Sequence, residues 1–140
     1  MSEAAVTGNE AAIAVAPEFF VHDMEESLRF YRDKLGFRVV RQEPDFAVVA
    51  LGSAFVLLAA AAAAVQYEMP GVREWLAGAP QGIGVNMLII VGDVDIMYQR
   101  ARSSGATIAK EIDDRDYGLR DFITADPDGY LLRFASPIEG

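Results

Sequence analysis

The stretch VHDMEESLRFYRDKLGF, residues 21–37, decides the fold because it contains an amphipathic helix together with both of its end signals. Asp23 can cap the helix, and Glu26, three residues later, can reach back to it as in a capping box. Gly36 supplies the residue that ends it. One helical face carries apolar and aromatic side chains, at Met24, Leu28, Tyr31 and Leu35.

The elements around this helix occur twice. Strand patterns flank it at residues 13–21, 37–42, 46–51 and 54–60, and a further strand pattern covers 85–91. Asp93 lies 70 residues after Asp23, and Gly105 ends a second helix as Gly36 ends the first. Residues 54–59 are echoed by residues 130–135 at an offset of 76. A duplicated β-α-β-β-β unit explains this order.

The predicted fold is therefore α+β, with two repeated β-α-β-β-β modules that form a curved eight-stranded cup and carry their helices on the outer face. Any ligand site is expected inside the cup. The predicted organisation is a disordered tail at 1–12, a first module at 13–64, a connector with a short helix at 65–82, a second module at 83–136 and a tail at 137–140.

Composition restricts the function. The chain has 140 residues, of which 52% are hydrophobic, so we expect one globular domain, or two small modules that share a core. Its longest apolar run, residues 54–65, is well short of the roughly twenty residues that span a bilayer. A net charge of −9 argues against a nucleic-acid partner and suits a cationic small molecule, although solubility is the commoner reason for it. The absence of cysteine and of a signal-peptide pattern predicts a cytoplasmic location.

Two motifs resemble those of the vicinal oxygen chelate superfamily, which includes glyoxalase I, the bleomycin-resistance proteins and the extradiol dioxygenases. Residues 21–37 match the pattern V-x-D-x-x-x-S-x-x-F-Y-x-x-x-L-G-F, which opens a module in that superfamily. Residues 117–122 (YGLRDF) and 126–129 (DPDG) resemble its closing segment. The resemblance covers roughly residues 13–136. It is specific for the fold and much less specific for function, because one fold hosts many chemistries.

The resemblance also locates the metal position of the family. In metal-dependent members, one divalent ion is bound by a His or Glu on the first and last strands of each module. Counting from the motifs places these four positions at Ala16, Leu57, Asn86 and Arg133. None of them is a good ligand, and the guanidinium of Arg133 repels a cation. We therefore expect neither a metal nor another cofactor, with Glu18 and His22 as the remaining candidate ligands.

Arg133 is a cation in a strand that the pattern predicts to be buried. Leaving it unpaired there would cost several kcal/mol. Glu18 is expected to point into the same cup, because side chains alternate between the two faces of a strand. Two interpretations follow from the sequence: a salt bridge between Glu18 and Arg133, or a contact of one or both with a ligand.

The sequence favours a binding protein over an enzyme, because it lacks a thiol, a second histidine, a Gly-x-Ser-x-Gly motif and a dinucleotide loop. The resemblance is closest in character to the metal-free bleomycin-resistance proteins, which sequester a bulky cationic antibiotic in the groove of a dimer. We accordingly expect a homodimer that binds a cationic or aromatic small molecule. The predicted ligand-binding residues are Glu18, Phe20, Leu57, Asn86, Leu88, Tyr117, Arg133 and Trp75.

Two alternatives remain at this point. The first is a metal-dependent lyase, isomerase or dioxygenase of the same superfamily, with ligands displaced from the counted positions. The second is a structural or regulatory module whose cup is filled by its own side chains. Each apolar residue of the predicted site is also explained as ordinary core, which is the commoner role of apolar residues on such strands.

Overall fold

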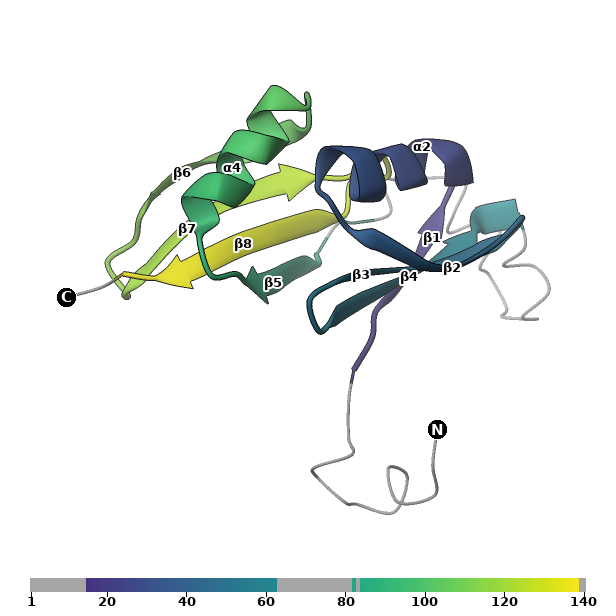
Figure 1. The fold of residues 1–140 in the computed structure, drawn as a ribbon, viewed down its shortest axis with the longest axis horizontal. Coiled ribbons are helices and arrows are strands. Elements are labelled where there is room, and N and C mark those ends of the chain that lie inside the picture. The colour runs from purple at the N-terminus through teal and green to yellow at the C-terminus, as the bar shows by residue number, and fades with distance from the viewer. Residues whose placement is uncertain (1–14, 63–81, 83, 139–140) are drawn as a thin grey trace, which may run out of the picture.

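The computed structural model describes residues 15–62, 82 and 84–138. The chain forms two successive β-α-β-β-β modules, each a four-stranded mixed sheet with a helix on one face (Figure 1). The strand orders are β1-β4-β3-β2 and β5-β8-β7-β6, and the described strands do not close into a barrel. The predicted fold class and the duplication are confirmed, with the eight strands divided between two sheets.

Most element limits follow the sequence patterns closely, but the first strand, predicted at 13–21, begins only at Glu18. The first module contains β1 (Glu18–Val21), α2 (Met24–Leu28), η2 (Arg29–Lys34), β2 (Arg38–Glu43), β3 (Phe46–Leu51) and β4 (Ala54–Ala60). The second contains β5 (Asn86–Ile90), α4 (Val94–Ser103), β6 (Thr107–Asp114), β7 (Leu119–Ala125) and β8 (Leu131–Pro137). The predicted tail at 1–12, the short helix of the connector and Trp75 lie outside the described residues. None of the described helices has the length and apolarity that a membrane crossing requires.

Both helices begin as predicted, because the carboxylates of Asp23 and Asp93 accept hydrogen bonds from backbone amides three residues later. The first helix differs from the prediction in its second half, which is π-helical from Arg29 to Lys34. There the amide of Leu35 reaches back five residues to the carbonyl of Phe30, at 3.1 Å. Phe30 and the adjacent Tyr31 are both buried against the sheet.

One hydrophobic core extends through both modules. On the helix-facing side of each sheet the side chains are buried, which follows from the two-residue alternation of strands. A single cluster of buried residues joins Tyr31 and Phe37 of the first module to Phe122, Phe134 and Tyr130 of the second. The two repeats therefore fold as one domain.

The DPDG turn at residues 126–129 connects the second module to the first. The hydroxyl of Tyr31 donates a 2.8 Å hydrogen bond to Asp126. One carboxylate oxygen of Asp128 accepts from the backbone amide of His22 at 3.1 Å and lies 2.7 Å from the His22 ring nitrogen Nδ1. The turn that precedes the last strand thus holds the start and the middle of the first helical segment.

The residue after this turn, Tyr130, extends the same junction. Its ring stacks on that of Phe19 with 4.0 Å between centroids, and its hydroxyl lies 3.2 Å from both the amide nitrogen and the carbonyl oxygen of Phe20. Gly82 packs against the backbone of the turn. A Cβ atom at Gly82 would lie 2.1 Å from the carbonyl oxygen of Gly129, so only glycine fits there.

Candidate functional site

Among the described residues, no helix or strand covers the sheet faces that point away from the helices (Figure 1). In strand β5, Ile89 is buried, whereas Leu88 and Ile90, on the opposite face, are 46% and 57% exposed. Large exposed apolar side chains on one surface are typical of a place where a ligand or partner binds. We call this surface of the second sheet the open face. Its side chains include those of Asn86, Leu88, Ile90, Asp121, Ile123, Leu131 and Arg133.

Arg133 lies on the open face within a charged group. Its Nε donates to Oδ2 of Asp121 at 2.7 Å, and its Nη2 donates to the hydroxyl of Tyr117 at 2.7 Å. The guanidinium carbon lies 5.4 Å from the centre of the Tyr117 ring, within cation–π range. Arg115 donates to the other oxygen of Asp121 at 2.6 Å. We call these four residues the arginine cluster.

Asp121 is the centre of the arginine cluster, with a side chain only 1% exposed. Burial opposes its ionisation, but the hydrogen bonds from Arg115 and Arg133 outweigh burial and hold the pKa of this carboxyl below its ordinary value. Asp121 is therefore a carboxylate shared by two guanidinium groups.

The sequence left two interpretations open for Arg133, a salt bridge with Glu18 or a contact with a ligand. The salt bridge with Glu18 does not form, because Arg133 pairs with Asp121. Glu18 lies in the other sheet, where β1 places it beside Leu57 of β4. Alternation identified the face of each strand correctly, but it does not tell which sheet a charged side chain will meet.

Asp121 and Arg115 were not predicted as site residues. The position of the DPDG turn could have indicated Asp121, because the turn fixes the centre of the hairpin formed by β7 and β8. Residues equally far from the centre of a hairpin pair with each other, so Ile123 faces Arg133, as the register shows. Asp121 is then the diagonal neighbour of Arg133 on the same face, within reach of a long side chain.

The strand register also tests whether a metal ion would fit. Leu57 faces Glu18 in the first sheet, and Arg133 faces Leu88 in the second. The first-strand residues that face the two last-strand positions are therefore Glu18 and Leu88, each two residues after the counted Ala16 and Asn86. One carboxylate, two leucines and a guanidinium do not fit a divalent cation. Among the described residues, no group of three or more His, Asp or Glu side chains could hold a metal ion.

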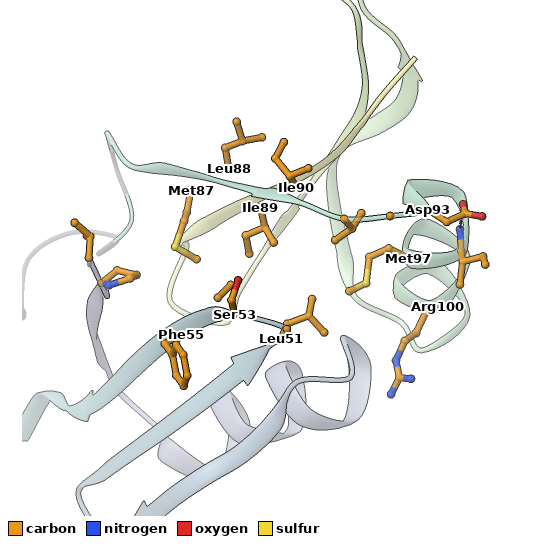
Figure 2. A pocket seen from close by; sticks show the side chains of 17 residues that line it. Leu51, Ser53, Phe55, Met87, Leu88, Ile89, Ile90, Asp93, Met97 and Arg100 are labelled. Carbon is orange, nitrogen blue, oxygen red and sulfur yellow. Dashed lines mark hydrogen bonds between the residues drawn. The ribbon is translucent and has the colours of Figure 1, made fainter. Parts of the chain in front are cut away.

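A cavity of about 840 Å³ lies between the two modules, where the β3–β4 turn approaches strand β5 (Figure 2). Its lining is mainly apolar and includes Leu51, Phe55, Met87 and Ile96, with polar groups from Ser53 and Arg100. Met87 and Ile89 point toward the turn, whereas Leu88 and Ile90 point to the other side of the strand (Figure 2). Arg133, Asp121 and Tyr117 do not line this cavity.

The structure brings together some of the predicted site residues. Tyr117 and Arg133 are hydrogen-bonded, and Leu88 is the strand partner of Arg133. Asn86 is exposed on the same edge strand as Leu88. The other predicted residues that the structure describes lie in the first sheet, at Glu18, Phe20 and Leu57.

Comparison with known proteins identifies the family. The model of the glyoxalase/bleomycin resistance protein/dioxygenase superfamily matches residues 13–134. The chain belongs to this superfamily. It is 29% identical over 131 residues to a protein of Geobacillus stearothermophilus named bleomycin resistance protein, which covers 88% of this chain and 96% of the relative. A Staphylococcus aureus protein of the same name gives the same values.

Solved structures from the superfamily share the fold. A glyoxalase/bleomycin resistance protein/dioxygenase from Nocardioides has a TM-score of 0.70 at 24% identity and covers 94% of this chain and 91% of its own. TioX from Micromonospora has a TM-score of 0.66 at 19% identity and covers 91% of this chain and 98% of its own. At these identities the likeness extends to the superfamily fold alone.

Proposed function

We propose that the protein is a metal-free small-molecule binding protein that acts by sequestration. One observation carries the proposal. The last-strand position that would hold a metal ligand, by resemblance to the metal-dependent members, carries Arg133, and its guanidinium is held on the open face by Asp121. A fixed cation there opposes a divalent ion. The 29% identity to bleomycin resistance proteins supports binding as the activity.

The open face supports an aromatic or apolar ligand. Tyr117, within the arginine cluster, is about half exposed, and so are Leu88 and Ile90 beside the cluster. Stacking of a ligand ring on a tyrosine contributes about 0.5–1.5 kcal/mol beyond the burial of apolar area. A cationic ligand, the other expectation from the sequence, is favoured by the net charge of −9 but is opposed locally by Arg115 and Arg133.

Isothermal titration of the purified protein with bleomycin and with a panel of aromatic metabolites tests this function. We expect saturable binding of at least one compound, which is recovered unchanged when the protein is denatured. Metal analysis of protein purified without chelator should find less than stoichiometric divalent metal. A stoichiometric metal, or a chemically altered compound, would contradict sequestration and favour the metal-dependent lyase, isomerase or dioxygenase.

We further propose that the protein is a cytoplasmic homodimer. Each four-stranded sheet has two edge strands among the described residues, and exposed apolar side chains occupy the open face. Open edges and apolar faces of this kind are usually covered by another chain. Light scattering should give about 30 kDa, twice the 15.2 kDa chain. A monomer at micromolar concentration would contradict the dimer, and cell fractionation checks the location.

A further inference from the structure

We propose that Arg133 receives the anionic group of the bound molecule, so that the ligand is an aromatic or apolar carboxylate and not a cation. This inference rests on the proposed function and specifies the ligand class of the same site. It follows from the charge balance of the arginine cluster, from the donors that Arg133 keeps available, and from the apolar surface around it.

The charge balance favours an anion at Arg133. Asp121 provides one negative charge for two guanidinium groups, and arginine stays protonated at any pH at which the protein folds. Asp113, opposite Asp121 on β6, acts on Arg115 and partly offsets its charge. Ile123 of β7 lies between Arg133 of β8 and Lys110 of β6, because it faces both residues across the sheet. Lys110 is another cation. The uncompensated positive charge therefore lies on the Arg133 side.

Arg133 also keeps a donor for a ligand. A guanidinium has five N–H donors. The Nε group donates to Asp121 and Nη2 donates to Tyr117, whereas Nη1 makes no hydrogen bond within the part of the chain that the structure describes. The side chain is 20% exposed, so a ligand can reach part of it from the open face. The contacts to Asp121 and Tyr117 fix the guanidinium in position before a ligand arrives.

The surroundings of Arg133 strengthen its interaction with an anion. Its strand neighbours are Leu88 and Ile123, which are apolar. Charge-assisted hydrogen bonds are stronger where apolar groups exclude water. Leu88 and Ile90 provide surface for an apolar body, and Tyr117, 59% exposed, offers an aromatic surface. A flat aromatic body with one carboxylate complements this combination.

Two probes with one ring system test the inference: 2-naphthoate and 2-naphthylmethylammonium, each titrated calorimetrically into the full chain. We expect 2-naphthoate to bind about tenfold more tightly or better. Arg133→Gln should weaken 2-naphthoate binding about tenfold and leave the ammonium probe unchanged or tighter. Arg120→Gln is the matched control. It also removes one positive charge, but from β7, and the ion-pair partners of Arg120 are the exposed Asp95 and Asp114. It should change 2-naphthoate affinity less than about twofold.

The outcomes separate the two proposals. If the ammonium probe binds as tightly as 2-naphthoate, or if Arg133→Gln and Arg120→Gln have equal effects, the inference is overturned and the proposed function stands. If neither probe binds, the inference is overturned, whereas the proposed function is decided by the titrations with bleomycin and the aromatic metabolites. Should Arg133→Gln fail to fold, Arg133→Lys and the wild type at 0.1 M and 0.5 M salt replace it. A 2-naphthoate affinity that is insensitive to both the lysine and the salt would overturn the inference.

Discussion

The hydroxyl of Tyr31 and the carboxylate of Asp126 are 2.8 Å apart across the junction of the two modules, although 95 residues separate them in the chain. Both groups are buried, and Oδ1 of Asp126 also accepts the amides of Asp128 and Tyr130. Burial raises the pKa of Tyr31 well above its ordinary value, so the phenol remains a donor. The turn of the second module is in this way fixed to the helical segment of the first.

Removal of this hydroxyl should destabilise the protein. Tyr31→Phe keeps the ring but leaves one buried oxygen of Asp126 without its donor, at a cost of about 1–3 kcal/mol in the free energy of unfolding. Urea denaturation measures the change. Tyr98→Phe is the matched control, because its hydroxyl donates to the exposed Glu111, and it should cause a much smaller loss. Equal losses in the two variants would contradict the role of the junction.

Asp126 should make stability depend on pH. Burial raises the pKa of Asp126 to about 6 from an ordinary value of 3.8. The folded state therefore binds the proton more tightly, so this stabilisation is fully present below about pH 4 and is lost as the pH rises through about 6. The shift of about two units corresponds to at most about 3 kcal/mol. In Asp126→Asn this titration is absent.

The comparison is made by measuring unfolding free energies of both proteins between pH 4 and pH 7.5. The wild-type value minus the Asp126→Asn value should fall between about pH 4 and pH 6 and level off above about pH 7, because the folded and unfolded forms of Asp126 bind different numbers of protons only between its unfolded and folded pKa values. A difference that stays constant with pH would show that Asp126 is not the responsible group.

Loss of the shared carboxylate should be costly. Asp121→Asn removes the carboxylate that Arg115 and Arg133 share, although their side chains are only 16% and 20% exposed. Breaking a buried ion pair from one side typically costs about 3–5 kcal/mol, and the partial exposure of both arginines favours the lower end. Thermal or urea unfolding measures the change. Asp95→Asn, which removes an exposed partner of Arg120, serves as control and should be nearly neutral.

Gly82 should tolerate no side chain. In Gly82→Ala the new methyl group would overlap the carbonyl of Gly129, and backbone atoms cannot move aside as a flexible side chain can. We expect a loss of about 1–3 kcal/mol in the free energy of unfolding, or more. Gly92→Ala is the control, since no atom lies within 4 Å of a Cβ at that position. If Gly82→Ala proves as stable as Gly92→Ala, the close contact with the turn does not exist in solution.

Local structure was largely predictable from the sequence. Strands β3 and β4 match the predicted ranges residue for residue, because Gly52 and Ser53 separate two apolar runs. The capping positions of Asp23 and Asp93 are also confirmed, because the capping hydrogen bond spans only three residues and is therefore a local feature of the sequence. The π-helical turn was not predicted, because apolar spacing does not reveal whether an amide reaches back four or five residues.

Long-range pairing was harder to predict. The salt bridge between Glu18 and Arg133, one of the two interpretations that the sequence left open, does not form because the two residues belong to different sheets, and no local pattern states how the sheets are placed. The contact of His22 with Asp128 depends on the same placement, across 106 residues. By contrast, Tyr117 and Arg133 were both predicted as site residues, and they are hydrogen-bonded to each other. Tyr117 lies just before strand β7, and Arg133 lies on β8, which forms a hairpin with β7.

The junction at the DPDG turn has a consequence for how the protein is made. Phe19 and Tyr31 are synthesised about a hundred residues before Tyr130 and Asp126, the groups that cover them. We expect the first module to leave the ribosome with these aromatic side chains in contact with water, and to acquire its final packing only when the last hairpin emerges. We expect the nascent chain to be open to chaperone binding during that interval, which lasts as long as translation through residues 32–125 takes.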